Sequence, residues 1–473
     1  MTAFGRWSWV ILITLGTVVS VYGQDKKEPA NKETGPVSYY KKIRPIFQQH
    51  CQGCHQPAKA SGGFVMTSFA DLLKKGDSGK TGIVPSHPEK SFLLDQLAAE
   101  KGKRPAMPPK GDTLTDAQVK LIARWVKEGA KDDTPAKAKV VVDMEHPPVY
   151  NLPPVISSVV YSPDGKYLAI AGYHEILLHK ADGSGLEARL VGQSERISSL
   201  AFSPDGKYLA ATGGSPGRFG EVQIWDVRGK RLRTSKSTTF DTVYGASWDK
   251  DSSIVAYGCS DNSVRAIDAK TGEQVFHNGG HNDWVLDTIF SKDSSHLISV
   301  SRDMSMKLSV VKTSRLVDNI TSITPGALKG GLLSVDRHPT KDQLLIGGAD
   351  GTPKIYKMFR DKARKIGDDF NKIRAFAALP GRVYSVSYNH DGTRIVAGSS
   401  YNGTGEVRVY EEKDGKLVCK LKGVEGGVYS VAFSPDGSKI ASAGFDGRVR
   451  INDANTGDLI REFVPCPIQT AKK

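Results

Sequence analysis

From residue 150 to residue 466, short segments alternate apolar and polar residues, a pattern that predicts β-strands. In one such segment, Tyr429, Val431 and Phe433 place apolar side chains at every second position, and a Pro-Asp-Gly turn follows. A small-residue segment, 441–444, comes next, and then an Asp-Gly turn and a further alternating segment. Because this order recurs along the region, we expect β-structure built from repeats.

Seven copies of the pattern align on the residue that ends the first segment. That marker residue is Tyr161, Phe202, Trp248, Phe290, Arg337, Tyr388 or Phe433, so successive copies lie 41, 46, 42, 47, 51 and 45 residues apart. Four short strands at this spacing are typical of one blade of a β-propeller, and seven blades would close into a ring. A solenoid is the alternative, but neither end of the region resembles the polar capping repeat that a solenoid needs.

Helical periodicity predicts a helix before the repeats, between residues 38 and 49. Tyr40, Ile43, Ile46 and Phe47 fall on one side of it. Pro45 predicts either a kink or a helix that begins near the proline, because proline removes a backbone donor and clashes with the preceding turn.

A second helix is predicted from Thr115 to about residue 128. Thr115 and Gln118 have capping-box spacing, and Gly129 is placed to end the helix. Its apolar stripe comprises Val119, Ile122, Trp125 and Val126. The sequence therefore predicts a multidomain protein, with a small all-α domain at 36–132, a linker at 133–149 and an all-β seven-bladed propeller at 150–466.

The first 23 residues have the pattern of a secretory signal peptide. Arg6 precedes an apolar run from Trp7 to Val21, and small or β-branched residues occupy the cleavage-type positions before residue 24. An uncleaved anchor that associates the protein with a membrane is the alternative, although the run is at the short end of what spans a bilayer. Both interpretations predict a periplasmic or otherwise extracytoplasmic protein.

The chain is basic, with 65 Lys and Arg residues against 51 Asp and Glu and a formal net charge of +14. In an exported protein this charge favours acidic partners or anionic surfaces, and we expect no nucleic acid partner.

Three of the five cysteines lie in the repeats, namely Cys259, Cys419 and Cys466. We expect buried single thiols there, with a bridge between Cys419 and Cys466 as the alternative.

Cys51-Gln52-Gly53-Cys54-His55 has the spacing through which proteins attach haem c. On a helical turn the two cysteines share one face, so both sulfurs can reach the vinyl groups at one porphyrin edge, and His55 falls under the iron as proximal ligand. A zinc half-site would need further ligands, and His50 and His87 make a poor tetrahedral set. A redox dithiol would follow a strand in a βαβ unit, which the flanking sequence does not resemble. We predict one covalently bound haem c.

Met107 is predicted to be the sixth iron ligand. Its thioether is a soft, neutral donor, and the neighbouring prolines stiffen its loop. Met66, in a short apolar run, and Met144, beyond the second helix, are the alternatives, and a lone methionine can also fill a gap in a core. The predicted cofactor-binding residues are Cys51, Cys54, His55 and Met107, of which His55 and Met107 bind the iron.

The haem motif belongs to a longer ordered set of segments. They are Ile43-Arg44-Pro45-Ile46, Cys51 to His55, Gly62-Gly63-Phe64, Gly76, Ile83-Val84-Pro85, Met107-Pro108-Pro109, Leu114-Thr115, and Trp125 with Gly129-Ala130. This order resembles the planctomycete-type cytochrome c domain. The resemblance implies covalent haem at Cys51 and Cys54, with His55 and Met107 as axial ligands. The chain departs from the family at Ser86 and His87, where members usually carry glycine after the proline.

The repeats contain one Trp-Asp pair, Trp225-Asp226, and one clear Gly-His pair, Gly280-His281. Together with the periodicity, these pairs resemble the WD-repeat family. The resemblance implies a rigid platform whose faces bind other proteins. Among catalytic patterns, no nucleophile elbow, phosphate loop or paired-carboxylate signature stands out in the repeats.

We therefore predict an exported c-type cytochrome that carries single electrons, with a propeller that docks a redox partner protein. Enzymatic activity stays an open question at this point. One alternative is a haem enzyme that reduces a small molecule with a second cofactor in the propeller, and the other is a mainly structural interaction scaffold. Histidines that could hold a second cofactor are His174, His179, His281, His296, His338 and His390, although none lies in a ligand motif.

Overall fold

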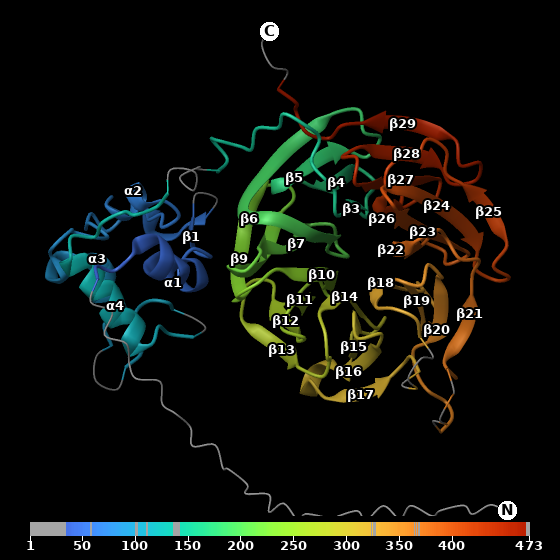
Figure 1. Ribbon diagram of the computed structural model, residues 1–473, viewed down its shortest axis with the longest axis horizontal. Helices are drawn as coiled ribbons and strands as arrows, with labels where there is room; N and C mark the ends of the chain where they lie inside the picture. The colour runs from blue at the N-terminus through green and yellow to red at the C-terminus, as the bar shows by residue number, and fades with distance from the viewer. Residues whose placement is uncertain are drawn as a thin grey trace, which may run out of the picture. The chain divides into compact units, whose positions relative to one another are not determined.

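The computed structural model describes residues 35–56, 59–99, 103–109, 112–135, 142–322, 324, 328–363, 365, 367 and 369–469. From residue 37 on they belong to one unit, Val37–Lys473, which is mostly β-structure in several sheets with few helices (Figure 1). The predicted signal segment, residues 1–23, and residues 136–141 of the predicted linker lie outside the described residues. The domain boundaries stay predictions. Of the helices in these ranges, none is long and apolar enough to cross a membrane.

The N-terminal part combines short helices with a two-stranded hairpin. Its elements are η1 (Tyr39–Ile43), α1 (Arg44–His50), β1 (His55–Gln56), β2 (Lys59–Ala60), η2 (Ser61–Gly63), α2 (Phe69–Leu72), η3 (Pro88–Lys90), α3 (Phe92–Leu97) and α4 (Asp116–Lys127). β1 and β2 pair in antiparallel fashion. The prediction of an all-α domain was therefore too simple, because the chain after the cysteines folds back as a hairpin.

The first predicted helix is divided at Pro45. A π-helical turn, η1, precedes α1, and Pro45 lies in the first turn of α1, where its missing N–H costs no hydrogen bond. The buried stripe runs through Tyr39, Ile43 and Phe47 at intervals of four residues. Tyr39 therefore takes the core position that the sequence analysis assigned to Tyr40, which is only half-buried.

The helix α4 is capped at both ends as the sequence predicts. Thr115 N–H donates to Gln118 Oε1 at 2.8 Å, and Gln118 N–H donates to Thr115 Oγ1 at 3.3 Å. Gly129, with φ of 95°, follows the helix. On the buried face, the ring of Trp125 stacks on Tyr39 with centroids 5.3 Å apart. These contacts form the core on which the cysteine turn rests.

The repeat region contains one seven-stranded sheet and five four-stranded sheets among the described residues. The seven-stranded sheet comprises β3 (Val159–Tyr161), β4 (Tyr167–Ala171), β5 (Tyr173–Lys180), β6 (Leu186–Phe202), β7 (Tyr208–Ser215), β8 (Phe219–Asp226) and β9 (Arg231–Thr239). The next two sheets comprise β10 (Val243–Trp248), β11 (Ile254–Cys259), β12 (Val264–Asp268), β13 (Gln274–Asn278), and then β14 (Val285–Phe290), β15 (His296–Ser301), β16 (Met306–Val310), β17 (Leu316–Asn319).

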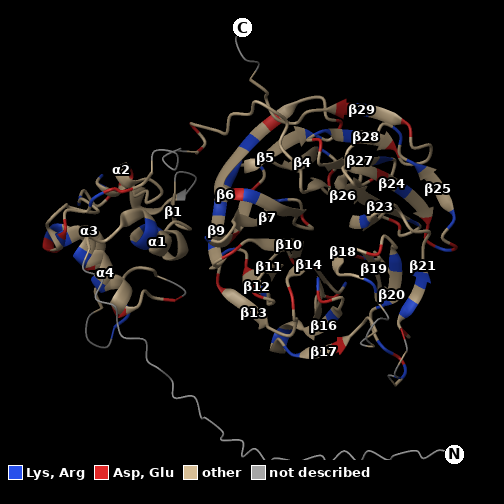
Figure 2. Ribbon diagram, viewed as in Figure 1, with Lys and Arg blue, Asp and Glu red and all other residues tan. Residues whose placement is uncertain are grey.

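The remaining three sheets follow the same order. They comprise β18 (Leu332–Arg337), β19 (Gln343–Gly348), β20 (Lys354–Lys357), β21 (Lys372–Ala375); β22 (Arg382–Tyr388), β23 (Arg394–Tyr401), β24 (Thr404–Glu411), β25 (Leu417–Lys420); and β26 (Val428–Phe433), β27 (Lys439–Gly444), β28 (Val449–Asp453), β29 (Leu459–Phe463). The sheets lie around a common centre, with Lys and Arg on outer strands such as β9 and β21 (Figures 1 and 2).

Each of the seven marker residues ends the first strand of its copy. The seven-stranded sheet holds two copies, because the 17-residue strand β6 pairs with β5 through its first part and with β7 through its last part. β6 is thus the fourth strand of the first copy and the first strand of the second. The repeat period read from the sequence therefore corresponds to four strands in every copy.

Neighbouring copies are joined near the centre by a recurring side-chain hydrogen bond, except the third and fourth, where Gly245 takes the position of the serine. Ser158 Oγ accepts from the N–H of Leu200 at 3.1 Å. The same bond joins Ser199 to Ala246, Ser334 to Val386, Ser385 to Val431 and Ser430 to Val159. Asp287 replaces serine between β14 and β18, and its Oδ2 accepts from Val335 N–H at 2.9 Å. The first strands also line a central cavity of about 460 Å³.

The first and last sheets of the repeat region touch each other. Ile156 N–H donates to the carbonyl of Gly444 at 2.9 Å, just before β3 begins. Tyr150 and Ile468 form a parallel bridge, so the chain segments that enter and leave the repeats lie side by side. The two ends of the repeat array are therefore tied together by backbone hydrogen bonds.

Candidate functional site

The two motif cysteines and the motif histidine occupy one backbone turn directly after α1. Cys54 N–H and His55 N–H both donate to the carbonyl of Cys51 at 3.1 Å. The helix ends at His50, so the turn projects from the helical core into the hairpin of β1 and β2. This local geometry brings the three candidate side chains to one wall of a cavity.

That cavity, of about 270 Å³, is the second feature of the site. Cys51, Cys54, His55 and Met107 all line it, and the rest of its wall is mostly apolar, including Phe64, Met66, Phe92, Leu93 and Leu97. Met107 reaches the cavity from a separate loop, whose backbone is fixed by a hydrogen bond from Met107 N–H to Gln96 O at 2.9 Å. The structure thus brings together all four residues of the predicted set.

The imidazole of His55 is held in one orientation. Its Nδ1 donates to the carbonyl oxygen of Phe64 at 3.0 Å, and the Phe64 ring packs edge-on against it with centroids 5.9 Å apart. A proton on Nδ1 leaves Nε2 as the lone-pair nitrogen, which is the form that binds a metal ion. Phe64 belongs to the Gly62-Gly63-Phe64 motif, but its role in orienting His55 was not predicted from the sequence.

The two thiols differ in environment. Cys51 is only 9% exposed, and burial, with a smaller contribution from Cys54, raises the pKa of its thiol to about 12. Cys54 is half-buried at the same cavity. Both are free thiols in the structure.

A glycine lets two loops of the site pack closely. A Cβ on Gly76 would lie 2.6 Å from the carbonyl oxygen of Gly62, so only glycine allows this approach. Gly76 lies in a hairpin closed by an antiparallel bridge between Lys75 and Thr81, and this hairpin carries Ser78 and Lys80 to the cavity. The Lys80 ammonium lies 4.7 Å from the centroid of the Phe92 ring. Lys80 is the one Lys or Arg among the described residues that line this cavity. It was not predicted from the sequence, because the family pattern includes Gly76 and Ile83 but no residue between them.

The two alternative methionines occupy different surroundings. Met66 is buried and lines the same cavity, but its N–H donates to His55 O at 2.8 Å, so it lies beside the segment that carries His55. Met144 is 45% exposed, and its sulfur accepts from Val191 N–H at 3.3 Å. Met107 is therefore the methionine that enters the cavity from a loop distant from His55 in the sequence.

The histidines considered for a second cofactor are dispersed over several sheets. His281 bonds to Asp303 and Ser299, and His179 Nε2 bonds to the carbonyl of Pro465 at 2.8 Å. Within the described ranges, no group of three or more His, Cys, Asp and Glu side chains is placed to hold a metal ion.

Cys259, Cys419 and Cys466 are buried free thiols, and the alternative bridge between Cys419 and Cys466 is not formed.

Comparison with known families confirms both sequence resemblances. The family described as planctomycete cytochrome C matches residues 51–111, which include all four candidate cofactor residues. The family described as WD domain, G-beta repeat matches residues 185–226, 272–308 and 415–453. The chain joins a planctomycete-type cytochrome c domain to WD repeats. The cytochrome c domain implies a haem c cofactor and suggests an extracytoplasmic location, and the WD repeats support a β-propeller and suggest protein–protein interaction.

Curated relatives match a part of this chain. Eukaryotic translation initiation factor 3 subunit I of Aspergillus oryzae is 25% identical over 178 residues, which are 34% of this chain and 51% of the relative. The protein of the same name from Chaetomium globosum is 27% identical over 165 residues, 31% of this chain and 46% of the relative. The chain spans about half the length of these relatives.

The cavity fits haem c by the chemistry of its wall. Two thiols three residues apart suit covalent haem attachment, and an imidazole with its Nδ1 proton engaged and a thioether from another loop are axial donors found in cytochromes c. The remaining wall is largely apolar, which suits a porphyrin. The arrangement supports a redox and interaction protein.

Proposed function

We propose that the protein is an exported c-type cytochrome that carries single electrons and uses its WD-repeat region to dock a redox partner. In this proposal Cys51 and Cys54 hold one haem c through thioether bonds, His55 is its proximal ligand and Met107 its distal ligand. The observation that carries the proposal is the convergence of these four side chains on one apolar cavity. The bound haem would supply a one-electron Fe(III)/Fe(II) couple.

The chain's own residues would tune that couple. The hydrogen bond from His55 Nδ1 to Phe64 O orients the imidazole and raises its basicity as a ligand. Met107 would close the sixth position, which favours electron transfer over substrate chemistry. The apolar wall formed by residues such as Leu93 and Leu97 excludes water and lowers the local dielectric constant. Lys80, at the cavity, would pair with a carboxylate of the haem.

The repeat region is proposed to be a closed seven-bladed propeller. The bond between Ser430 and Val159 repeats, at the junction of the last and first sheets, the bond found between inner neighbours. Such a ring would be rigid, which suits a docking platform for a redox partner. Export through residues 1–23, with the mature chain in the periplasm, agrees with the compartment in which haem c is attached, and an uncleaved segment would also anchor it to the membrane.

A haemochrome measurement tests the haem proposal. The full chain is expressed in a bacterial host able to mature c-type cytochromes, and haem type and number are read from a pyridine haemochrome spectrum and from intact mass. We expect one haem that acid acetone does not extract, and its loss in the double variant Cys51→Ala, Cys54→Ala. The matched control Cys259→Ala changes another buried thiol, outside the cavity, and should keep the haem. Protein without covalent haem would overturn the proposal.

A further inference from the structure

The two ends of the strands in the repeat region carry different side chains. Because successive strands are antiparallel, the connections between second and third strands lie at the same end as the connections that lead into each first strand. We name this end the loop face. The opposite end, named the turn face, carries the connections between first and second strands and between third and fourth strands.

Exposed aromatic side chains concentrate on the loop face. Among the described residues this face holds Leu152, Val155, Tyr173, Phe240, Trp284, Met304, Tyr401 and Phe445, with exposed fractions from 37% to 78%. The turn face of the described repeat region holds Phe359 and, at the first residues of four fourth strands, Leu186, Leu316, Leu417 and Leu459, so it has one exposed aromatic residue against five on the loop face. Exposed apolar side chains grouped on one surface are typical of protein interaction sites, because leaving them in water is unfavourable.

Part of this apolar set is continuous across three neighbouring copies. A Cβ on Gly427 would contact the side chain of Ser400, next to Tyr401, and would lie 3.7 Å from Phe445 Cβ. A Cβ on Gly447 would lie 2.6 Å from Cβ of Pro153, in the segment that carries Leu152 and Val155. Tyr401, Phe445, Leu152 and Val155 therefore belong to one surface formed by adjoining loops.

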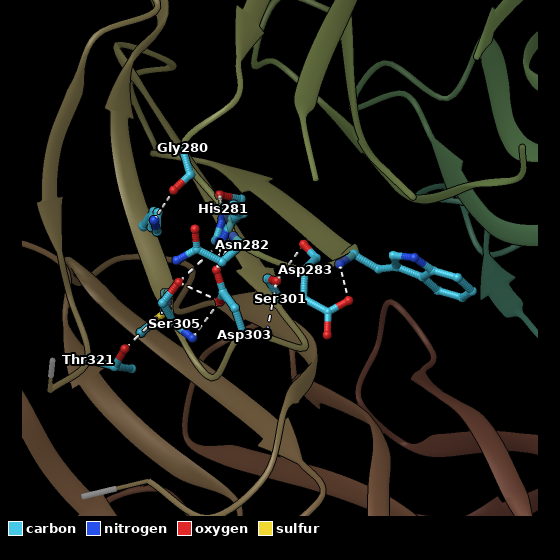
Figure 3. A network of polar contacts seen from close by, with 12 residues as sticks. Gly280, His281, Asn282, Asp283, Ser301, Asp303, Ser305 and Thr321 are labelled. Carbon is cyan, nitrogen blue, oxygen red and sulfur yellow. Dashed lines mark hydrogen bonds and ion pairs between the residues drawn. The ribbon is translucent and has the colours of Figure 1, made fainter. Parts of the chain in front are cut away.

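A polar network on the same face, seen around His281, Asp283 and Asp303 in Figure 3, holds the backbone of the loop that carries Trp284. His281 Nδ1 bonds to Asp303 Oδ2 at 3.0 Å, and Asn282 N–H donates to the same oxygen at 2.8 Å. The backbone N–H of Trp284 donates to Asp283 Oδ1 at 2.7 Å. The indole ring is restrained by the guanidinium of Arg302, 4.8 Å from its centroid, and by the stacked ring of Tyr244, with centroids 6.0 Å apart. An aromatic side chain fixed in this way loses little entropy when a partner covers it.

The charges of the loop face favour an acidic partner. Its exposed cations in the described residues are Arg196, Arg218, Arg302, Lys329, Arg382, Lys422 and Arg448, whereas its exposed acids are Asp261 and Glu425. Of these cations, Arg218, Arg302, Lys422 and Arg448 form ion pairs with Glu195, Asp283, Asp458 and Glu462. Other acids of this face are engaged inside the loops, as when Asp446 bonds to Arg450 at 2.7 Å. Arginine beside aromatic residues is the composition enriched in protein interfaces.

We propose that the loop face binds a partner protein through a segment in which carboxylates alternate with apolar side chains. The apolar residues would cover the surface around Tyr401 and Phe445, and the carboxylates would pair with exposed arginines such as Arg382. This inference deepens the proposed docking role, since it names the surface and the chemistry of the segment that the surface recognises. It concerns the repeats alone and does not depend on the haem.

Fluorescence anisotropy with synthetic peptides tests the inference. The probe is a short labelled peptide in which Asp and Glu alternate with Leu and Phe, added to the full-length haem-loaded protein. We expect saturable binding that weakens as salt is raised, and an affinity loss of about tenfold or more in the double variant Tyr401→Ser, Phe445→Ser. The matched control Phe359→Ser removes the exposed aromatic of the turn face and should bind as the parent does.

Two comparison peptides and one further measurement make the test decisive. A Lys/Leu peptide and an Asp/Gly peptide should both bind at least about tenfold more weakly, because each lacks one half of the recognised chemistry. Equal binding of the Lys/Leu peptide, or binding lost only in Phe359→Ser, would overturn the inference. So would self-association of the protein, measured by sedimentation and lost in the double variant, because a second copy would then occupy the face. The haemochrome spectrum is read on the same samples, so a missing haem refutes the proposed electron carrier separately from the peptide result.

Discussion

The side chain of Ser430, in the first strand of the last sheet, accepts a hydrogen bond at 3.0 Å from the N–H of Val159, in the first strand of the first sheet. The two residues are 271 positions apart in the sequence. Substituting Ser430→Ala should lower the free energy of unfolding by about 1 kcal/mol, because a buried backbone N–H loses its partner. Denaturant unfolding measures the change. Ser198→Ala, at a half-buried serine beside Ser199, is the control and should change the free energy by less than about 0.5 kcal/mol.

The proposed roles of the two cavity methionines lead to opposite expectations. Met107→Ala should retain the covalent haem but open its sixth position, so the sulfur-to-iron absorption band is lost, the iron becomes high-spin and the reduction potential falls. Met66→Ala, at the other methionine of the same cavity, should keep the band. Absorption spectroscopy and redox titration of both variants distinguish the roles. Loss of the band in Met66→Ala alone would assign the ligand to Met66.

Ser86 adopts a backbone conformation that favours glycine, with φ of 65°. Its N–H donates to the carbonyl of Val126 at 2.9 Å, so contact with α4 holds the strained turn in place. Ser86→Gly should relieve ~1–2 kcal/mol of backbone strain, offset by ~0.5–1 kcal/mol of additional unfolded-state entropy. We expect a net gain of about 0.5–1 kcal/mol in the free energy of unfolding. Ser86→Ala keeps the Cβ and should show no such gain in thermal or denaturant unfolding.

Asp287 should make the repeat region less stable as the pH rises. Burial raises the pKa of Asp287 to about 7, and the neighbouring Asp336 contributes in the same direction. Because the pKa of aspartate is near 3.9 in an unfolded chain, the folded protein holds the extra proton between about pH 4 and pH 7. The stabilisation from this proton is complete below about pH 4 and is lost as the pH rises through 7.

The variant Asp287→Ser, which restores the serine found at this position in other copies, isolates that effect. Between pH 5 and pH 8 the parent should lose about 2 kcal/mol more in free energy of unfolding than the variant. Chemical denaturation at the two pH values provides the measurement. Parallel pH profiles of parent and variant would show that this carboxyl group does not contribute.

The sequence predicts local features better than the contacts made between distant segments. The capping box of Thr115 and Gln118 was predictable because both partners are three residues apart and the bond is local. Tyr39 was missed because a π-helical turn before Pro45 shifts the buried stripe, and helical periodicity assumes a regular α-helix. The order of the strands in each repeat could be predicted from the spacing. The joining of two copies through β6 could not, because the sequence of β6 does not show whether the strand pairs with one neighbouring strand or with two.

In the candidate site, too, the local features were easier to predict than the contacts between distant segments. Cys51, Cys54 and His55 are adjacent in the sequence, so their shared turn could be predicted from spacing alone. The position of Met107 at the same cavity depended on the fold of the intervening loops, although the proline-rich segment indicated it correctly. The hydrogen bond between His55 and Phe64 uses a backbone carbonyl, which any residue could supply. Lys80 reaches the cavity wall through the conformation of a hairpin. Neither feature could therefore be recognised from the residue types in the sequence.

The continuous strand β6 affects how the repeats could have been shuffled during evolution. Where two copies meet at a loop, a whole copy can be duplicated, deleted or moved, and new chain ends can be made there by circular permutation. A break within residues 186–202 would instead cut hydrogen bonds to both β5 and β7. The first two copies should therefore be inherited and permuted as a single unit, whereas the later copies can be exchanged individually.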